Sequence, residues 1–269
     1  MHEWLSNGGL ARVSEEVGKV ALPSIRLIAH PAEESQLRVG STKFGGSPDL
    51  PQETRWPERN GSALPFVAQI NLAEVAPYDL SHLLPATGIL AFFFDQDAFF
   101  ESRPVDQATS WQVCYTPGLP SDLWRLPIPE HIPQRRRYRP SGVTCAIEMT
   151  LPDYSQYDST SVERLGLSGP LTDEEEQAYY SIQAHLAGIA DANYHIPIHR
   201  LLGHPDDVQW DMHRDLGGAS ADWQLLFQVD SDDTPDTDWG DTGRIYYWIR
   251  TRDLAERHFS QVQVILQCT

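Results

Sequence analysis

Residues 46–52, GSPDLPQ, are repeated in altered form at residues 203–209, GHPDDVQ, with four identities in seven positions and a shift of 157. Both copies follow the pattern G-x-P-D-x-x-Q. Glycine permits a positive φ, proline sets φ to about −65°, and aspartate can bond the backbone two residues further on. These residue types predict a tight turn in each copy, and they favour a structural role for the pattern itself.

Two further pairs of apolar segments follow the turns in the same order. In the first pair, a glutamine (Gln69 or Gln228) stands at the same place in the run. In the second pair, a glycine (Gly88 or Gly243) opens the run. The paired runs are 66–70 with 225–229, at a shift of 159, and 88–94 with 243–249, at a shift of 155. Three blocks in one order, with shifts that agree within four residues, predict an internal duplication.

Strand-like segments outnumber helical ones. Runs rich in aromatic and β-branched residues predict strands; these runs are 25–29, 36–39, 66–71, 88–95, 111–115, 143–149, 223–230, 243–250 and 259–266. Helical spacing of apolar residues predicts an N-terminal helix at about 9–21. Thr172 and Glu175 form a capping box that predicts a helix reaching about residue 190, and a short helix is expected at 252–258.

These patterns predict an α+β fold that is internally duplicated, with two intertwined, β-rich antiparallel repeats and peripheral helices. The repeats are expected at about 35–135 and 143–268. A chain of 269 residues is long enough for one large domain, so we expect a single domain over residues 1–269. Because neither repeat brings an obvious cap for its sheet edge, we expect neither repeat to fold alone.

Composition and charge exclude several classes of protein. Hydrophobic residues make up 41% and charged residues 22%, which is typical of a soluble globular chain. Lys and Arg number 20 against 38 Asp and Glu, a net charge of −18, so nucleic acid and anionic membranes are disfavoured as partners. The longest wholly apolar run is only residues 89–94, and the three cysteines have no CxxC spacing. A cytoplasmic location is therefore expected.

The acidic charge is concentrated in the second half. Residues 1–140 carry 13 basic and 16 acidic side chains, a net of −3, whereas residues 141–269 carry 7 and 22, a net of −15. Between the halves stand Arg135, Arg136, Arg137 and Arg139. This basic segment predicts either a solvated connection or ion pairs with the acidic half.

Five short blocks of sequence form a combination that is specific enough to indicate a family, although each block alone is weak evidence. The blocks are KFGGSP at 43–48, WP at 56–57, FVAQI at 66–70, LGHP at 202–205 and WGDTG at 239–243. Together they resemble the YwqG-like family of bacterial proteins, a domain of unknown function, over roughly residues 35–268. The resemblance implies an α+β fold of two intertwined antiparallel repeats and an intracellular location. It supplies no established reaction and no catalytic residues, and only a weak association with bacterial toxin and immunity gene neighbourhoods.

Standard catalytic motifs are absent from the sequence. There is no GxSxG, no HExxH, no Walker glycine-lysine loop and no GxGxxG after a strand. Cys114 and Cys145 lie in strand-like runs without a neighbouring histidine, which favours structural thiols over a nucleophile. With 38 acidic residues to choose from, no glycosidase-like carboxylate pair can be selected. The sequence therefore leaves open whether the protein is an enzyme.

Two clusters contain metal-ligand residue types. His195, His199 and His204 stand near Asp206 and Asp207, but the HxxxH spacing brackets the non-helical residues IPI, and no further ligand follows at zinc spacing. The loop 230–241 holds six aspartates but lacks the glycine and glutamate of a calcium loop, which favours a solvated acidic hairpin loop. We expect no metal and no cofactor, with a metal at the histidines or calcium in the loop as the alternative.

A twofold relation between the repeats would bring equivalent loops together in one groove. The expected ligand-binding residues are Lys43, Trp56, Gln69, His204, Asp206, Gln228, Trp239 and Asp241. Such a groove has a cationic wall, an acidic wall and flanking indoles, which suits a small-molecule, peptide or basic protein ligand. Alternatively, these residues lock the repeats together, each glutamine bonding the backbone of a turn. The leading interpretation is a binding or interaction module, of immunity type; the alternative is a hydrolase with its active site in the cleft between the repeats.

Overall fold

The computed structural model describes residues 1–101, 109–118, 123–158, 160–190, 196–217 and 219–269. Within this part of the chain, ten strands form one antiparallel sheet in the order β14-β13-β12-β11-β1-β10-β2-β6-β7-β8. The strands are β1 (Leu22–Pro31), β2 (Lys43–Phe44), β6 (Phe66–Asn71), β7 (Gly88–Phe94), β8 (Trp111–Pro117), β10 (Ser141–Thr150), β11 (His199–Leu201), β12 (Trp223–Asp230), β13 (Arg244–Arg250) and β14 (Gln263–Gln267). At the centre, β1 and β10 pair along their whole length.

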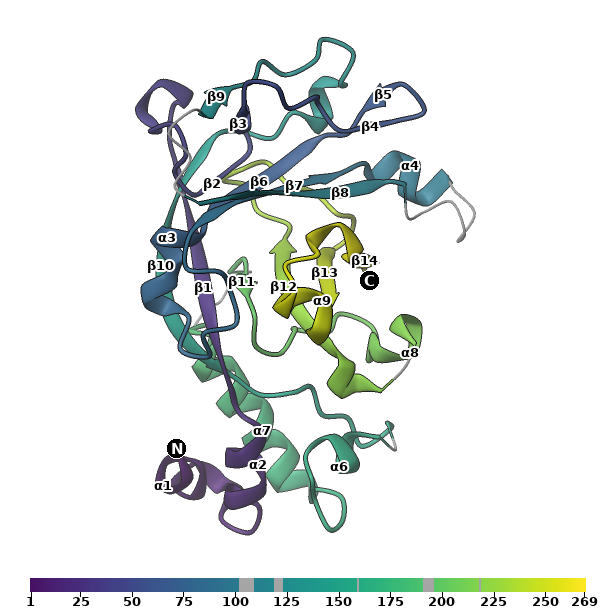
Figure 1. Cartoon of the computed structure of the whole chain (residues 1–269). Coiled ribbons are helices and arrows are strands. Elements are labelled where there is room, and N and C mark those ends of the chain that lie inside the picture. Colours follow the sequence, from purple (N-terminus) through teal and green to yellow (C-terminus); the bar gives the residue numbers. More distant parts are fainter. Residues whose placement is uncertain (102–108, 119–122, 159, 191–195, 218) are drawn as a thin grey trace.

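Two arms extend from this central pair, and the sheet bends back on itself (Figure 1). The first arm consists of β2, β6, β7 and β8, and the second arm of β11, β12, β13 and β14. Their outer ends meet, since the indole Nε1 of Trp111 donates to the carbonyl of Val262 at 2.9 Å, and the Tyr115 and Phe259 rings lie 4.9 Å apart. The sheet is therefore strongly curved and nearly closed.

Short elements surround the sheet. Two small two-stranded sheets are formed by β3 (Asp49–Pro51) with β9 (Leu123–Arg125), and by β4 (Glu58–Arg59) with β5 (Ser62–Ala63). The helices are α1 (His2–Leu5), α2 (Ser14–Val20), α3 (Leu72–Val75), α4 (Gln96–Glu101), α6 (Ser161–Arg164), α7 (Asp173–Leu186), α8 (His213–Leu216) and α9 (Thr251–Ala255). The 3₁₀ and π turns are η1 (Ser6–Leu10), η2 (Glu34–Gln36), η3 (Ala76–Tyr78), η4 (Gln134–Arg136), η5 (Ser220–Asp222) and η6 (Phe259–Gln261). None of these described helices has the length and apolar character needed to cross a membrane.

The main core lies between the arms and is built from both. The Phe92 ring of the first arm lies 4.7 Å from Phe227 and 5.0 Å from Tyr247 of the second arm. Trp239, which is fully buried, packs against Phe94 and Tyr138 at 5.9 and 5.4 Å. Aromatic burial of this kind is among the largest contributions to stability, so the two arms stabilise each other.

A second apolar cluster joins the N-terminal helices to α7. Leu10 and Val17 pack there with Tyr179 and Ile182 of α7. The predicted capping box is present, because the Thr172 hydroxyl accepts from the Glu175 amide while the Glu175 carboxylate accepts from the Thr172 amide. The helix ends at Leu186, four residues before its predicted end.

The predicted α+β class is confirmed, and two strands, β6 and β12, have the predicted bounds. The predicted strand at 36–39 is wrong. Glu33 and Gln36 instead form a capping box around the 3₁₀ turn η2. The side chain of Arg125 takes the carbonyls of Glu34 and Leu37 as hydrogen-bond acceptors, at 2.6 and 2.9 Å. These carbonyls are therefore bonded to a side chain rather than to a neighbouring strand.

The N-terminal helix predicted at 9–21 is broken. Helical structure begins at His2, passes through the π turn η1, and resumes in α2 at Ser14. Gly9 has φ of 101°, a value that interrupts a helix and that glycine adopts readily. The spacing of the apolar residues therefore predicted which face of the helical segment is buried, but it did not predict the break at Gly9.

The arginine-rich segment before β10 forms ion pairs with both halves. Arg135 and Arg136 lie 2.5 and 2.7 Å from the Asp97 carboxylate of the first half. Arg139 lies 3.2 Å from Asp236, in the acidic second half. The ion-pair interpretation of this segment thus holds for Arg139, while its neighbours pair within their own half.

Candidate functional site

The first turn, around Gly46, encloses a buried charge cluster. Asp49 and Lys43 are both fully buried, with Lys43 Nζ 3.4 Å from Asp49 and 3.0 Å from Glu34. The Arg125 guanidinium lies 2.9 Å from the Asp49 carboxylate. The Gln69 amide accepts from the Asp49 amide and donates to the Asp49 carboxylate, at 2.8 and 2.9 Å. Each charge in this cluster therefore has a partner of opposite sign.

The second turn, around Gly203, has a corresponding cluster. The Gln228 amide accepts from the Asp206 amide at 3.0 Å and donates to the Asp206 carboxylate at 3.1 Å. Arg200 lies 3.1 Å from the same carboxylate, and Arg244 lies 3.9 Å away. Burial raises the pKa of Asp206, but the charges of Arg200 and Arg244 outweigh it, so the pKa lies below its usual value. Asp206 is therefore ionised at neutral pH.

Both glutamines thus bond the turn of their own half. Gln69 and Gln228 are fully buried, and in the described part of the chain no hydrogen bond or ion pair joins one cluster to the other. Satisfied buried amides of this kind stabilise a fold. The structure therefore brings Lys43 together with Gln69, and Asp206 with Gln228, in two clusters.

The other expected groove residues lie in different surroundings. Trp56 donates its indole N–H to the Leu64 carbonyl, and Trp239 donates to the Asp230 carbonyl within the core. The Asp241 side chain is exposed. The next cavity is lined by only one of the eight expected ligand-binding residues, as far as the structure describes them. That residue is His204.

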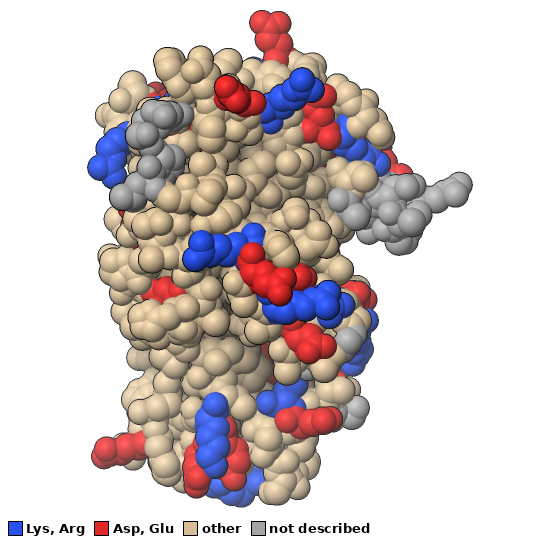
Figure 2. All heavy atoms as spheres, in the orientation of Figure 1, with Lys and Arg blue, Asp and Glu red and all other residues tan. Residues whose placement is uncertain are grey.

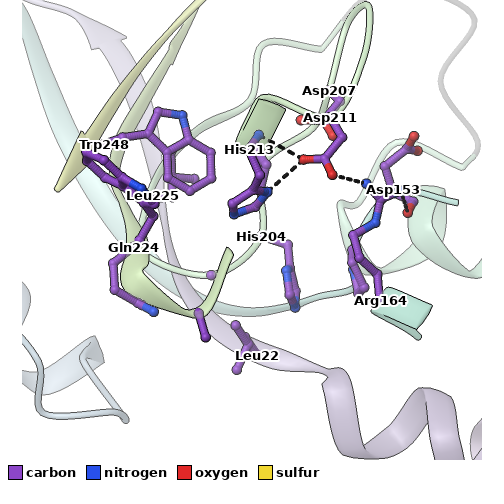
Figure 3. Close-up of a pocket in the computed structure, with 15 residues that line it drawn as sticks. Leu22, Asp153, Arg164, His204, Asp207, Asp211, His213, Gln224, Leu225 and Trp248 are labelled. Atoms are coloured by element: carbon purple, nitrogen blue, oxygen red, sulfur yellow. Dashed lines mark hydrogen bonds and ion pairs between the residues drawn. The ribbon is translucent and has the colours of Figure 1, made fainter. Parts of the chain in front are cut away.

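This cavity, of about 260 Å³, lies between the second arm, the loop that follows Gly203, and the segment that follows β10. Figure 3 shows two unlike walls. Trp248, Leu225 and Gln224 lie on one side of the view, and Asp153 and Arg164 lie on the other. The cavity therefore has an apolar, aromatic wall opposite a charged one.

One ion-pair chain occupies part of the charged wall. The Asp211 carboxylate lies between His213, whose Nδ1 is 2.6 Å away, and the Arg164 guanidinium, at 2.5 Å (Figure 3). Burial raises the pKa of Asp211, but hydrogen bonds from His213 and the charge of Arg164 outweigh it and hold the pKa well below its usual range. Asp211 is therefore ionised and internally paired.

Asp153 and Asp207 are not paired in this way. Neither carboxyl forms an ion pair with a described residue, and Asp207 Oδ1 is buried without a hydrogen-bond partner in the described part of the chain. Burial, followed by the charges of nearby aspartates, raises the pKa of Asp207 well above its usual value. Burial likewise raises the pKa of Asp153 to about 6. The cavity thus contains two carboxyl groups whose ionisation the fold opposes.

His204 presents a neutral ring to the cavity. Its Nε2 lies 2.7 Å from the Val20 carbonyl, which can only accept, so Nε2 carries the proton. Burial lowers the pKa of His204 to about 4, so the ring is uncharged at pH 7. Nδ1 is then a hydrogen-bond acceptor rather than a donor.

The histidines of the predicted metal cluster are engaged separately. His195 lies outside the described residues. His199 Nε2 lies 3.0 Å from the Asp232 carboxylate, while His204 bonds Val20. Among the described residues, the only group close enough to share a metal ion is Asp253, Glu256 and His258, beside α9.

The acidic loop 230–241 is only partly solvated. Asp230 is fully buried and lies 3.0 Å from Arg244, and Asp232 is nearly buried against His199. The prediction of a solvated loop is wrong for these two residues, because basic side chains compensate their burial. The remaining four aspartates of the loop are exposed.

Sequence reasoning missed most of the cavity residues. Asp153, Arg164 and Trp248 stand in segments with no motif, and only the fold brings them together. The signal that was available came from the turn itself, where Asp207 directly follows the G-x-P-D pattern. Asp211 and His213 are two residues apart, and this spacing is too common to indicate a functional site.

The raised pKa of Asp153 predicts a pH-dependent stabilisation by Asp153→Asn. The folded-state pKa of about 6 exceeds the usual 3.8, so the fold opposes ionisation and wild-type stability falls as pH rises from about 4 to about 6. We expect the variant to be more stable by about 2 kcal/mol at pH 7, a figure reduced for partial exposure, and unchanged at pH 4. Urea unfolding at both pH values measures this difference.

The exposed Asp241→Asn variant is the control, expected to change stability by less than about 0.5 kcal/mol at either pH. A loss of stability in Asp153→Asn at pH 7 would contradict the prediction, because it would mean that the ionised carboxylate is stabilised by the fold.

Comparison with known proteins assigns the chain to a family without an assigned activity. No curated protein matches the chain significantly. Residues 42–268 match a family described as a domain of unknown function, and this range includes both turns and all the labelled cavity residues except Leu22. The expectation of a domain of unknown function is thereby confirmed. The chain belongs to this family, Domain of unknown function (DUF1963).

Proposed function

We propose that this protein is a binding module whose ligand enters the cavity beside Asp207. The ligand is a small molecule, or a single group of a peptide or basic protein. One observation carries the proposal: Asp207 is among the residues that line the cavity, and its Oδ1 is a buried acceptor without a partner in the described part of the chain. Buried polar atoms are normally hydrogen-bonded, and a ligand group would satisfy this one.

Cavity size limits the ligand. A volume of about 260 Å³ is slightly below the range of about 300–1,000 Å³ that is usual for small-molecule sites. One amino-acid side chain or a small metabolite fits such a space better than a nucleotide does. The Trp248 and Leu225 wall supplies apolar contact, and the carboxyl wall supplies polar contact.

Charge makes nucleic acid and membrane surfaces poor partners for this protein. The net charge is −18, and the residues that line the cavity include three aspartates, Asp153, Asp207 and Asp211, against one arginine, Arg164, in the described part of the chain. On the face in Figure 2, basic and acidic side chains lie next to one another rather than forming a basic patch. Phosphate groups would meet repulsion instead of counter-charges. A cytoplasmic location is part of the proposal, and free Cys114, Cys145 and Cys268 support it.

An internal duplication, and with it the YwqG-like relationship, is the structural part of the proposal. The strand order reads alike outward from the central pair in both arms. Lys43 and Arg200 stand opposite Gln69 and Gln228 in their sheets, and each pairs with the aspartate of its own turn. Each also donates to a turn carbonyl, Ser47 or His204. Shared order, shared contacts and shared sequence support a common origin of the two halves.

A hydrolase is the second candidate, favoured by the unlike carboxyl groups in one cavity. Asp153, with a pKa of about 6, could deliver a proton near neutral pH, whereas Asp211 is ionised. Carboxyl pairs with separated pKa values perform acid and base roles in many hydrolases. Turnover of a bound ligand, lost in Asp153→Asn, would favour this candidate over binding alone.

Ligand-observed NMR with a panel of small fragments tests the binding proposal. The panel contains pentylamine, pentanoate, 5-aminopentanoate, glycerol and inorganic phosphate. Leu22, which lines the cavity and is 37% exposed, is replaced by Trp to obstruct the cavity, and Leu83, which is 38% exposed, is replaced by Trp as the matched control. We expect at least one fragment to bind wild type and Leu83→Trp, and to bind Leu22→Trp at least tenfold more weakly. Absence of binding to wild type, or equal binding to all three proteins, would overturn the proposal.

A further inference from the structure

We propose that the outer edge of β14 binds an extended segment of a basic partner protein, which adds to the sheet as an antiparallel strand. The site is a groove bordered by β14, the start of β8 and α8. Among the described residues, this groove shares no lining residue with the cavity beside Asp207. The inference therefore goes beyond the proposed function and is tested independently of it.

β14 ends the ten-stranded sheet and has a neighbouring strand on one side only. It pairs with β13, and no strand lies on its other side in the described part of the chain (Figure 1). β8, at the opposite end of the sheet, does not fill this place, because Trp111 and Tyr115 contact Val262 and Phe259, which precede β14. Alternate residues of β14 therefore direct backbone N–H and C=O groups toward a side that has no strand.

A groove of about 930 Å³ runs along this edge. Four consecutive residues of β14, 263–266, line it, although consecutive side chains of a strand point to opposite faces of a sheet. The groove therefore follows the edge itself rather than one face. The five residues of β14 span about 17 Å at about 3.4 Å per residue, which is room for a paired strand of similar length.

β14 lacks the features that usually prevent a sheet edge from pairing. Its sequence, QVILQ, contains no charged residue and no proline, and its register with β13 has no bulge. Three of its five residues are apolar, in a chain of which 22% is charged. Regular apolar edges of this kind pair with other strands unless something covers them. The edge of β14 is therefore suited to a peptide in the extended conformation.

Charge favours a basic partner over a second copy of this chain. β14 and α8 belong to residues 141–269, whose net charge is −15, and a second copy would bring the same charge to the edge. Asp215 of α8 is exposed and lines the groove, where its carboxylate accepts from the Trp210 indole at 3.0 Å. The adjacent Arg214 lies 3.3 Å from Asp158 instead. A lysine or arginine of the partner would supply the cation that this carboxylate lacks among the described residues.

The two faces of the groove require different side chains from the peptide. Leu266 and Trp111 pack on the main core, so a strand beside β14 would meet apolar surface on that face. Ile265 packs on the opposite face, against the cluster that includes Leu216, and Asp215 directly precedes Leu216 in α8. A peptide with apolar side chains at alternate positions, and basic side chains between them, would match both faces.

Fluorescence polarisation with labelled hexapeptides tests this pattern. KVKVKV has the expected alternation, KKKVVV has the same composition without the alternation, and EVEVEV has the alternation with the opposite charge. We expect KVKVKV to bind at least tenfold more tightly than either control. Equal binding of KKKVVV would mean that charge alone causes the interaction and would overturn the proposal, as would absence of KVKVKV binding.

Two N-methylated forms of KVKVKV test the backbone pairing. Methylation of the valine amides removes the N–H donors from one edge of the peptide, and methylation of the lysine amides removes them from the other edge, because alternate N–H groups of a strand point to opposite sides. Only one edge of the peptide can face β14. We therefore expect one form to lose at least tenfold in affinity and the other to bind as the unmethylated peptide does. The same affinity in both forms would overturn the pairing.

Hydrogen–deuterium exchange and a charge reversal locate the site. We expect KVKVKV to slow amide exchange within residues 263–267, and Asp215→Lys to weaken its binding at least fivefold. Asp241→Lys, at an exposed aspartate outside the groove, changes the net charge equally and is the control, since charges are screened beyond about 8 Å at 0.15 M salt. Thermal melting verifies that both variants are folded. Slower exchange only elsewhere, or equal effects of the two variants, would overturn the proposal.

The other possible occupant of the edge is a second copy of this chain. Sedimentation equilibrium of the protein alone, with amide exchange measured at the same concentrations, distinguishes the two occupants. We expect a monomer in which residues 263–267 become protected only when KVKVKV is added. Dimerisation that protects the same residues without peptide would mean that β14 pairs with its own copy, and it would overturn the proposal.

Discussion

Asp49→Ala is expected to lower the free energy of unfolding by about 3–5 kcal/mol at pH 7, because it leaves a buried cation incompletely paired. Asp49 is fully buried beside Lys43, which is fully buried as well, and it accepts from Arg125 at 2.9 Å. It also accepts from the Gly40 amide and from Gln69. Truncation removes all of these bonds at once. Urea unfolding followed by tryptophan fluorescence measures the loss.

The pH dependence has a definite sign. Burial raises the pKa of Asp49, but the hydrogen bond from Arg125 and the charge of Lys43 outweigh it, so the folded-state pKa lies below its usual value. The stabilising contribution is therefore present above about pH 3.9 and is lost as pH falls through the folded-state pKa. The difference between wild type and variant should narrow in that acidic range.

Two controls separate charge from shape. Asp49→Asn keeps the size of the side chain but not its charge, and is expected to lose less stability than Asp49→Ala. Glu53→Ala, at an exposed residue of the same loop region, should change stability by less than about 0.5 kcal/mol. A loss below about 1 kcal/mol for Asp49→Ala would mean that the buried charges are compensated without this carboxylate.

Local chemistry explains what the sequence predicted well. The bounds of β6 and β12 follow from apolar runs that are almost wholly buried, since these strands lie inside the sheet with neighbours on both sides. The start of α7 was predictable because the capping box depends only on Thr172 and Glu175, three residues apart. Such features depend on near neighbours and on burial, both of which leave a pattern in the sequence.

Long-range contacts explain the features that could not be predicted from the sequence. Residues 36–39 have a strand-like composition, but Arg125, about ninety positions away, bonds the neighbouring carbonyls. The cavity likewise joins Asp153 to Trp248, residues that approach only because β10 and β13 belong to one curved sheet. Charge alone also cannot distinguish an exposed ligand-binding lysine from Lys43, which is fully buried. Only His204 and Asp207, beside the repeated turn, carried a local signal.

A fragment of residues 1–138 is expected not to unfold cooperatively, which is the largest effect we predict. In the intact sheet β1 pairs with β10 on one side and β11 on the other, and both partners lie beyond residue 138. β2 likewise loses its pairing with β10. The fragment therefore keeps a ten-residue strand whose backbone groups have no strand partner.

The fragment also loses the core that the two arms share, and this loss destabilises it further. Phe92, buried against Phe227 and Tyr247 in the whole protein, would face water in the fragment. Circular dichroism during urea titration should give a gradual change, and the fragment should bind the dye ANS. Mixing it with residues 139–269 should restore a sigmoidal transition, because the missing strands and aromatic partners come from that segment. A sharp transition in the isolated fragment would instead mean that the first arm closes on itself and that β1 finds another partner.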